Sequence, residues 1–484
     1  MRTAAHYQLL GTFPLLCLAA ACVSAPDYTT PPTIAAIEQA GEYSAQNTLS
    51  GERTALSNWW SAIGKSELES MVERLKTDSL ELAQVRARIL QTRARAKQSK
   101  GARLPTLRGG TDLSYSRSRT SPASDLNWSD RYSLDFLLGW DADIFGGLRS
   151  AQRASTLTAA AAELAYQDSE RKQIAILARN WLAAATLKRR ITQSEVIAES
   201  FKQTFEVTDQ RYRSGSIQVS AADVQISKQN YESALAETPG LISQLQVQLN
   251  AIDIQLGRLP SQTYSDFVGE LEIDINAALP FGLPAHLLRQ RPDVAAAELR
   301  YRAALQDVGT ARSNLYPNLF LSSSLVFQGV NPGDVFKVED YISGLVSSLI
   351  APIYQGGRLR QEVRVQTAAA DEFAASFALT ALGAVADVED ALARLEGSRL
   401  QITQLRKAVQ SAELANRLAQ ERYRTGLESL LKVLETQRSL NAVTLKLIIA
   451  EQEFLNAKID LYLGIGSDWA SLEGERQEVD SSDE

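Results

Sequence analysis

The chain has 484 residues and a mass of 53.0 kDa, which a rough prior of one domain per ~150 residues would divide into about three domains. Glycine and proline together number only 41, about 8% of the chain where an average protein has roughly 12%, so compact globular domains are disfavoured. The formal net charge of −7 argues against a nucleic-acid binder that neutralises phosphates. With two Cys, two His and two Met, and no GxxxxGKS/T, HExxH, GxSxG or CxxC motif, the chain offers little for catalysis. We therefore expect a protein that moves or holds something, with no enzymatic activity, metal or cofactor.

The N-terminus resembles a bacterial lipoprotein signal peptide over residues 1–21. Arg2 supplies a positive charge, and residues 9–18 form an apolar stretch that is too short to span a bilayer. Three alanines precede Cys22, the residue that such signals leave acylated at the start of the mature chain. We therefore expect lipid on Cys22, and the alternative is ordinary cleavage with Cys22 unmodified. Val23 rather than an aspartate follows the cysteine, which favours the outer membrane by the bacterial sorting convention.

The mature chain begins with a stretch that is unlike the rest. Residues 22–60 are rich in Pro, Ser and Thr and are expected to form an irregular tether or surface strap. No uninterrupted apolar run of 18 residues follows Cys22, so we expect no transmembrane helix. If the protein spans a membrane, it must do so as a closed β-barrel, because lipid cannot satisfy the open edges of a sheet.

Two stretches of the first half alternate with period two and are predicted to be strands at 109–118 and 131–145. In the second stretch every other residue from Tyr132 to Ile144 is apolar, and the opposite face carries aspartates and a serine. A segment of about 10 residues that is apolar on one face and acidic or hydroxylic on the other suits a barrel strand between lipid and an aqueous lumen. The edge of a soluble β-sandwich is the alternative.

The first half also predicts very long helices. No proline lies between Ala123 and Thr238, and Gly215 is the only glycine between Leu148 and Thr238. Because proline costs ~3 kcal/mol and glycine ~1 kcal/mol in a helix interior, stretches so poor in both favour helix. At 1.5 Å per residue the first of these helices is about 100 Å long. The predicted segments are helix 66–103 with a break near 77–79, helices 148–213 and 219–256, and a linker at 257–284.

The second half repeats the pattern of the first. The pair Leu104-Pro105 recurs as Tyr316-Pro317, 212 residues later. Gly146-Gly147 and the run Arg211–Gly215 recur at offsets of 210 and 211 residues. Three landmarks with nearly one offset indicate an internal duplication, with structural repeats at 22–284 and 285–464. The second repeat predicts helix 287–315, strands 318–328 and 341–354 with Ile342, Val346 and Ile350 on one face, helices 358–424 and 428–463, and then an acidic tail at 465–484.

The number of strands predicts an oligomer. Each half contributes two strands, and the four strands of one chain cannot close a barrel around a lumen. A barrel of ~8 strands is filled by side chains, whereas ~16 strands leave an aqueous channel. Three chains would supply 12 strands and a usable pore, which the long helices would extend out of the membrane. The residues alone therefore predict a mainly α-helical protein with a β-barrel part, which forms an oligomeric pore.

This duplicated helix–hairpin–helix plan resembles the TolC/OprM-like outer-membrane efflux proteins over nearly all of the mature chain. The most specific match is the run Leu288–Val294, which is close to the family's RRPD motif before a mid-chain helix. The run Ala311–Pro317 leads into the third strand, and Arg422–Gly426 is followed by Leu434–Leu440. Together with Cys22, these motifs indicate the lipoprotein branch of the family.

The resemblance implies a fold, a function and partners. A homotrimer would form a 12-strand barrel in outer-membrane lipid, continued by a periplasmic barrel of helices. It would be a passive exit duct for drugs or other small molecules, fed by an inner-membrane transporter through a periplasmic adaptor protein. A duct for protein secretion or metal export, and a periplasmic helical scaffold without a channel, remain as alternatives. No nucleic-acid partner is expected.

The resemblance also assigns roles at the helical tips. The turns at Gly215 and Gly426, with the neighbouring Tyr212, Arg213 and Arg424, would contact the adaptor. Tyr423 matches a tyrosine that holds the tips of the family shut by bonding an aspartate. Asp223 is the nearest candidate for that aspartate, two places after the family position, which holds Ala221 here. Packing at a helix end is the alternative role for Tyr212 and Tyr423.

Two further groups of residues complete the expected sites. By resemblance, Glu435 is an acidic ring residue beneath the gate, and Lys432 stands where some relatives have a second acid. Arg291, Pro292 and Asp293 form the family motif, which also has a local physical reading. Proline is favoured in the first turn of a helix, and Asp293 places a negative charge at the positive end of the helix dipole.

Overall fold

The structure is a computed structural model that describes residues 25–39, 58–118, 127–271, 273–275, 291–337 and 341–465. The predicted signal peptide, Cys22 and the acidic tail after residue 465 lie outside the described residues. The chain divides into two compact units, each built from three segments. Of the described residues, those within Met1–Pro31, Arg88–Glu163 and Ala296–Phe377 form the sheet unit, and those within Pro32–Ala87, Leu164–Ala295 and Ala378–Glu484 form the hairpin unit.

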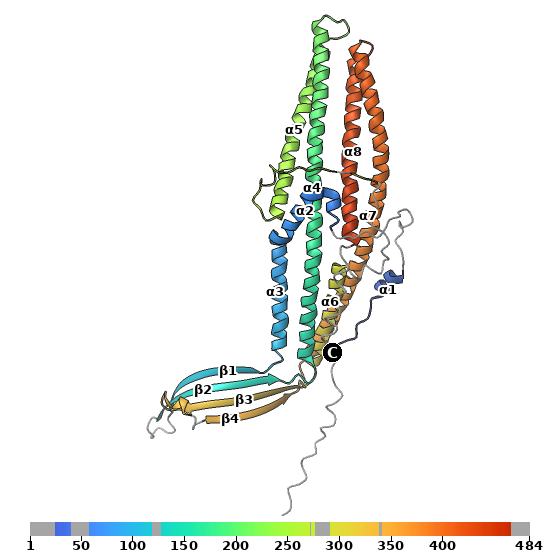
Figure 1. Ribbon diagram of the computed structural model, residues 1–484. Coiled ribbons are helices and arrows are strands. Elements are labelled where there is room, and N and C mark those ends of the chain that lie inside the picture. The colour runs from blue at the N-terminus through green and yellow to red at the C-terminus, as the bar shows by residue number, and fades with distance from the viewer. Residues whose placement is uncertain are drawn as a thin grey trace, which may run out of the picture. The chain divides into compact units, whose positions relative to one another are not determined.

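The sheet unit contains one four-stranded antiparallel sheet (Figure 1). Two strands come from each half of the chain, and the spatial order is β1-β2-β3-β4. Among the described residues of a single chain, the outer edges of β1 and β4 have no partner strand. The strands are β1 (Thr106–Ser118), β2 (Asn127–Asp141), β3 (Asn318–Gly329) and β4 (Tyr341–Ile350).

The register gives this sheet two different faces. Paired residues in antiparallel strands share a face, and Phe136 of β2 lies opposite both Gly109 and Leu325. When this register is extended over all four strands, most of the large apolar side chains lie on one face of the sheet. We call this face the outer face and the opposite one the inner face. The outer face carries Leu107, Leu113, Tyr115, Tyr132, Leu134, Phe136, Leu138, Trp140, Leu319, Leu321, Leu325, Phe327, Tyr341, Leu345 and Leu349.

β2 and β4 end earlier than the alternation predicted, whereas β1 ends at residue 118 as predicted and β3 ends one residue late, at Gly329. β2 stops at Asp141 instead of residue 145, because Asp143 takes a positive φ of 43° and turns the chain. The Asp143 carboxylate then accepts the backbone N–H groups of Leu148 and Arg149, at 2.8 Å each, and caps the next helix. β4 stops at Ile350 instead of residue 354, since Pro352 has no N–H for the ladder.

The strands of the first half also begin earlier than predicted, at residues 106 and 127 instead of 109 and 131. In β1, Gly109 and Gly110 interrupt the alternation, so the pattern becomes visible only after them. In the structure the backbones of Thr106 and Gly139 are paired. This pairing does not require alternating polar and apolar side chains, so the sequence pattern did not indicate it.

The hairpin unit contains the tip-bearing parts of two helical hairpins (Figure 1). One hairpin is α4 (Gly147–Arg213) with α5 (Ala221–Gln255), and the other is α7 (Arg358–Arg424) with α8 (Leu430–Ile465). Both α4 and α7 have 67 residues, about 100 Å at 1.5 Å per residue. α5 runs through Pro239 without a break.

The remaining helices are short. α2 (Ser61–Asp78) and α3 (Leu80–Gly101) are separated at Ser79, which has an extended backbone, where the sequence predicted a break. α6 (Pro292–Ser313) follows the RPD motif. The expectation of an irregular 22–60 segment misses α1 (Pro32–Gln39), which starts with proline at its first helical position.

One described helix, α7, is long and apolar enough to cross a membrane, where the sequence predicted none. An 18-residue window of it has a mean hydropathy of 1.3. Alanine supplies much of that value, and the side chains of Ala370, Phe377, Ala381 and Ala384 are buried at helical spacing inside the protein. Of that window 22% is buried, so one face of α7 packs inside the protein while the rest is exposed in a single chain.

Candidate functional site

The tips of the two helical hairpins are built by the same turn. After α4, the Ser216 N–H donates to the Arg211 carbonyl at 3.1 Å and the Gly215 N–H donates to the Tyr212 carbonyl at 3.0 Å. After α7, the N–H groups of Leu427 and Gly426 make the same two bonds, to Arg422 and Tyr423. This pair of bonds is the Schellman motif, which needs a left-handed residue after the helix. Both tip glycines have φ of +79°, so glycine at these places follows from the backbone.

The surroundings of the two glycines differ. A Cβ on Gly426 would lie 2.9 Å from the Gln218 Oε1 and 3.4 Å from an Arg211 nitrogen. A Cβ on Gly215 would have no heavy atom of the described chain within 4 Å beyond its immediate neighbours. The second tip is therefore packed against residues of the first hairpin, whereas the Gly215 turn is open.

Tyr423, at the end of α7, is buried and only 4% exposed. Its hydroxyl lies 2.9 Å from the hydroxyl of Thr208 on α4, which is fully buried. Thr208 donates its single hydroxyl proton to the Thr204 carbonyl at 2.7 Å, so Tyr423 is the donor in the bond to Thr208. Tyr423 thus links the last turn of α7, in the second hairpin, to α4 of the first hairpin.

Arg211 holds the same tyrosine from a second direction. Its guanidinium lies over the Tyr423 ring, 4.9 Å from the centroid, and donates to the Tyr423 carbonyl at 2.6 Å. It also donates to the Gln218 side chain at 2.8 Å. A cation over an aromatic face is worth ~0.5–2 kcal/mol, depending on exposure. We call Thr208, Arg211, Gln218 and Tyr423 the tip latch.

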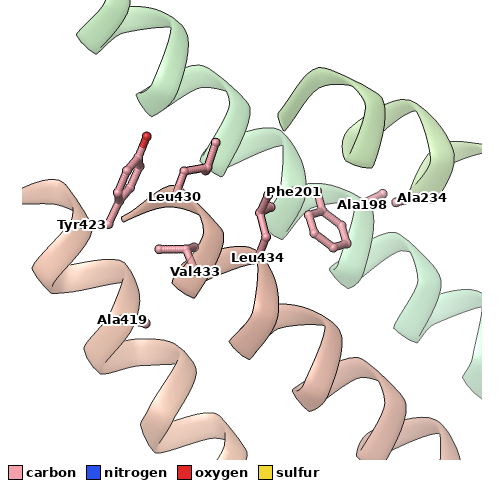
Figure 2. Packing of buried hydrophobic residues seen from close by; sticks show 8 residues of the cluster. All are labelled: Ala198, Phe201, Ala234, Ala419, Tyr423, Leu430, Val433 and Leu434. Atoms are coloured by element: carbon pink, nitrogen blue, oxygen red, sulfur yellow. The ribbon is translucent and has the colours of Figure 1, made fainter. Parts of the chain in front are cut away.

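Apolar side chains form a buried cluster that includes Tyr423 of the latch (Figure 2). Leu430, Val433 and Leu434 of α8 lie beside Tyr423 and Ala419 of α7. Ala198 and Phe201 of α4 and Ala234 of α5 complete the cluster. A pocket of about 20 Å³, lined in part by Tyr423 and Val433, is large enough for one water molecule.

Asp223 lies in a different bonding network from Tyr423. Its carboxylate accepts the Ser220 N–H and hydroxyl, at 2.8 Å each, and the Ser220 hydroxyl accepts the Asp223 N–H at 3.2 Å. This reciprocal pair is a capping box at the start of α5. In this chain Tyr423 therefore bonds Thr208, a residue that the sequence did not single out, and a gating role for Asp223 stays a prediction.

Lys432 and Glu435 lie on the exposed face of α8. The Lys432 ammonium is 3.0 Å from a Glu435 carboxylate oxygen, and the two side chains are 50% and 68% exposed. An exposed pair of this kind contributes little to stability. The position is compatible with the predicted acidic ring, in which Lys432 would partly neutralise Glu435, and that role stays a prediction.

The residues predicted to contact an adaptor lie at the surface of the tips. Tyr212 is 45% exposed, and Arg213 forms an ion pair with Asp209 at 2.8 Å. Arg424 is exposed and lines the small pocket beside Tyr423. Although Tyr212 and Tyr423 occupy equivalent places in the two halves, one faces solvent and the other is buried.

Farther from the tips, hydroxyl groups on α4 join the two hairpins. Ser200, Thr204 and Thr208 recur every fourth residue and so share one face of the helix. The Gln437 side chain of α8, which is buried, donates to the hydroxyls of Ser200 and Thr204 at 3.0 and 2.9 Å. The i, i+4 spacing of the hydroxyls was visible in the sequence, but their partners were not.

Two carboxylates of α8 continue this contact with charge. Glu451 is buried and accepts Arg189 of α4 at 2.9 Å and Arg406 of α7 at 3.2 Å. Asp460 likewise pairs with one arginine of α4, Arg179, and one of α7, Arg394. Each carboxylate therefore ties three helices together, and sequence reasoning missed both because the partners are distant in the chain.

The RPD motif forms a buried ion-pair cluster at the start of α6. Arg291 is 3% exposed and donates two hydrogen bonds to Asp293, at 3.1 and 2.7 Å. It also donates to Asp387 at 3.1 Å and to the Gly464 carbonyl at 3.1 Å. Burial opposes the charged form of Asp293, but the hydrogen bonds and charge of Arg291 outweigh it and lower the Asp293 pKa. Pro292 opens α6 as predicted, so the motif has a structural role here.

Comparisons with known proteins agree with this architecture. The family model described as "Outer membrane efflux protein" matches residues 71–258 and 283–467. The chain is 29% identical to the pyoverdine export outer membrane protein OpmQ of Pseudomonas putida, over 91% of this chain and 94% of OpmQ. It is 27% identical to the outer membrane protein OprJ of Pseudomonas aeruginosa, over 93% of each chain.

A solved structure shows the same fold. The outer-membrane channel OprN is 25% identical and superposes with a TM-score of 0.85, covering 93% of this chain and 100% of OprN. The proteins of this family are channels of efflux pumps and not enzymes. The matched residues include both halves of the duplication, with the sheet strands and the long helices. The chain therefore belongs to the outer membrane efflux protein family, and it is an outer-membrane channel of an efflux pump.

Proposed function

We propose that the chain is the exit duct of a tripartite efflux pump. Three copies would close one 12-strand barrel in the outer membrane, and the helical hairpins would reach a periplasmic adaptor that is bound to an inner-membrane transporter. The observation that carries this proposal is the sheet of a single chain, which has an apolar outer face and two unpaired edges.

The edges require closure by other copies. Each unsatisfied backbone group costs several kcal/mol in lipid, so the free edges of β1 and β4 must pair. Four strands are too few for a barrel with a lumen, whereas β4 of one copy can pair with β1 of the next. Three copies give 12 strands, between the ~8 strands of a filled barrel and the ~16 of an open channel.

The outer face has the layout of a lipid-exposed barrel wall. Tyr132 and Tyr341 lie toward the end of the sheet that is distal to the helices, and Trp140 lies toward the helical end. Leucines such as Leu134 and Leu325 occupy the band between them. Aromatic girdles on either side of an apolar band are typical of outer-membrane barrels.

The N-terminal strap supports lipid anchoring at Cys22. Ala25 packs against Gly309 of α6, within 3.1 Å of where its Cβ would be, and Ser150 of α4 borders the same site. Ser150 follows β2 by less than ten residues, so Ala25 lies near the helical end of the sheet. Cys22 is three residues upstream, a reach of at most ~11 Å. An acyl chain on Cys22 would thus enter the membrane beside the barrel rim.

The tips provide both the gate and the docking surface. The latch of Arg211, Thr208, Gln218 and Tyr423 would keep the second hairpin against the first while the duct is at rest. The turns at Gly215 and Gly426, with Tyr212, Arg213 and Arg424, would receive the adaptor and release the latch. The cargo would be a small molecule, as it is for the similar protein OpmQ, a pyoverdine export protein.

The test is to extract the protein from outer membranes and measure its mass and its conductance. We expect a detergent-extracted species three times the chain mass, with an acylated N-terminal peptide and conductance in planar bilayers. A periplasmic scaffold would instead leave the membrane without detergent and would conduct nothing. Crosslinking in cells followed by identification of the captured adaptor would separate drug efflux from protein secretion or metal export.

A further inference from the structure

The two β-hairpins of the sheet differ in charge. β1 and β2 contain Arg108, Asp112, Arg117, Asp130, Arg131, Asp135 and Asp141. β3 and β4, their counterparts in the second half, contain no charged residue. The duplicated hairpins therefore share a backbone plan but give the sheet two unlike halves.

The register shows what the second hairpin presents on the inner face. Val346 of β4 lies opposite Ser322 of β3, and Ile350 and Ile342 lie four pairs farther in either direction, on the same face. Phe320 and Val326 of β3 share this face, interleaved with serines. These five apolar residues and their serine neighbours form what we call the uncharged stripe. Ile342, Val346 and Ile350 therefore point away from the apolar outer face, which Leu345 and Leu349 supply in β4.

The first hairpin presents mainly charged and polar side chains on the same inner face, with Leu137 as its large apolar member. Asp112 lies opposite Ser133, and Asp135 lies opposite Gly110. Arg108 and Arg131 add positive charge to this charged stripe. A Cβ on Gly110 would lie 3.0 Å from an Asp135 carboxylate oxygen, which confirms that the two residues share a face.

We propose that the uncharged stripe is the specificity-determining wall of the duct, which favours amphipathic solutes with exposed apolar surface. This inference rests on the proposed trimeric duct, in which three uncharged stripes alternate with three charged stripes around the lumen. Water wets the charged stripe, whereas apolar side chains gain from contact with an apolar solute. Serines between them supply hydroxyls for the polar groups of the same solute without charge selection.

The experiment uses three serine-to-cysteine variants of the full chain in outer membranes. Ser322→Cys lies in the uncharged stripe, Ser133→Cys lies in the charged stripe, and Ser323→Cys lies on the outer face. Each is treated with a membrane-impermeant cationic methanethiosulfonate, with the parent chain as background. Tetraphenylphosphonium and tetramethylammonium are added as competitors, because they carry the same charge and differ in apolar surface. Access from outside does not require the tip gate to open.

We expect reaction at Ser322→Cys and Ser133→Cys and none at Ser323→Cys. Tetraphenylphosphonium should slow the reaction at Ser322→Cys, by about twofold at its half-saturating concentration. Tetramethylammonium should slow neither, and tetraphenylphosphonium should leave Ser133→Cys unaffected. Adding Phe320→Ser and Val346→Ser to the Ser322→Cys chain should abolish the protection while the cysteine stays reactive.

Two results would overturn the inference, and they are distinguishable. Equal protection of Ser322→Cys and Ser133→Cys, or protection of neither, would show that the stripe makes no selection although the lumen exists. Reaction at Ser323→Cys without reaction at Ser322→Cys would show that the inner face does not line a lumen, and the proposed duct would then fail as well.

Discussion

The two halves of the chain keep one backbone plan and use it differently. α4 and α7 have equal lengths of 67 residues, and each ends in a Schellman turn with a glycine at φ of +79°. Tyr212 and Tyr423 stand at equivalent places before these turns, yet they are 45% and 4% exposed. The first tip supplies a hydroxyl and a guanidinium, and the second supplies the buried tyrosine that they hold. The duplication thus preserved the backbone geometry of both tips. Side-chain divergence gave the first tip the groups that hold the tyrosine of the second tip.

The contact between the halves changes along the hairpins. Toward the tips it consists of hydrogen bonds in which at most one partner is charged, such as Tyr423 to Thr208, Gln437 to Ser200 and Arg211 to the Tyr423 carbonyl. Farther from the tips it consists of charged groups on α8, Glu451 and Asp460, each between two arginines. An ion pair adds Coulomb attraction that a hydrogen bond to a neutral group lacks, so the halves are held less firmly at the tips. The substitutions below test this gradient, from the largest expected effect to the smallest.

Removing the charge of Glu451 should have the largest effect on stability. Glu451→Gln would leave Arg189 and Arg406 without their shared carboxylate and should destabilise the protein by about 2 kcal/mol, less than a fully buried pair because both arginines are partly exposed. Thermal unfolding of the detergent-extracted protein measures this loss of stability. The control is Glu199→Gln, whose ion pair with Lys202 stays within α4 and should leave the unfolding midpoint unchanged. Equal midpoints for the two variants would remove Glu451 from the contact.

The tip glycines provide a matched pair. Gly215→Ala forces a side chain into a left-handed backbone at a cost of roughly 1–2 kcal/mol. Gly426→Ala carries the same cost and also displaces Gln218, whose oxygen would lie 2.9 Å from the new Cβ. We expect faster hydrogen exchange at both tips in Gly426→Ala and only at its own tip in Gly215→Ala. The same response to both changes would mean that the tips do not pack on each other in solution.

Arg211 and Arg422 occupy equivalent places, but only Arg211 reaches the other hairpin. Arg211→Gln removes the cation from the Tyr423 ring and should weaken the latch by about 1 kcal/mol. If the latch closes the gate, the open population rises about fivefold, and resting conductance in bilayers rises with it. Arg422→Gln should not alter conductance, since within the described part of the chain Arg422 pairs with nearby Glu428, at 4.0 Å, and not with the other hairpin. An unchanged conductance in Arg211→Gln, with assembly intact, would reduce the latch to helix packing.

The smallest effect concerns Lys432 and Glu435. At the equivalent places of the first hairpin, 211 residues earlier, stand the uncharged Ala221 and Val224. If Glu435 lines the pore, Glu435→Gln should lower cation selectivity and Lys432→Gln should raise it, because Lys432 pairs with Glu435 at 3.0 Å. The reversal potential should shift in opposite directions, most clearly at low salt, where screening is weak. Shifts in one direction, or none, would place the selective ring elsewhere.

The helices were predictable because their signals are local. The absence of proline from both helices and the Gly-Gly pairs before them located α4 and α7 to within one residue at each end, and the repeated Arg-Tyr-Arg run located both tips. Strand ends were harder to place, since β2 stops where Asp143 caps α4 and not where its apolar alternation stops. A polar residue that caps a helix cannot be distinguished from a polar residue of a strand by the alternation of polar and apolar residues alone.

The sequence by itself determined the duplication, the element types and the family, because these depend on periodicity, breaker residues and short motifs. Only the tertiary structure decided the partners. Tyr423 bonds Thr208, 215 residues away, and Glu451 joins Arg189, 262 residues away. It also decided that Leu345, and not its neighbour Val346, joins the outer face, since strand register sets which of two apolar neighbours lies on that face. Contacts between distant segments depend on how faces are brought together, and a linear pattern carries no record of that geometry.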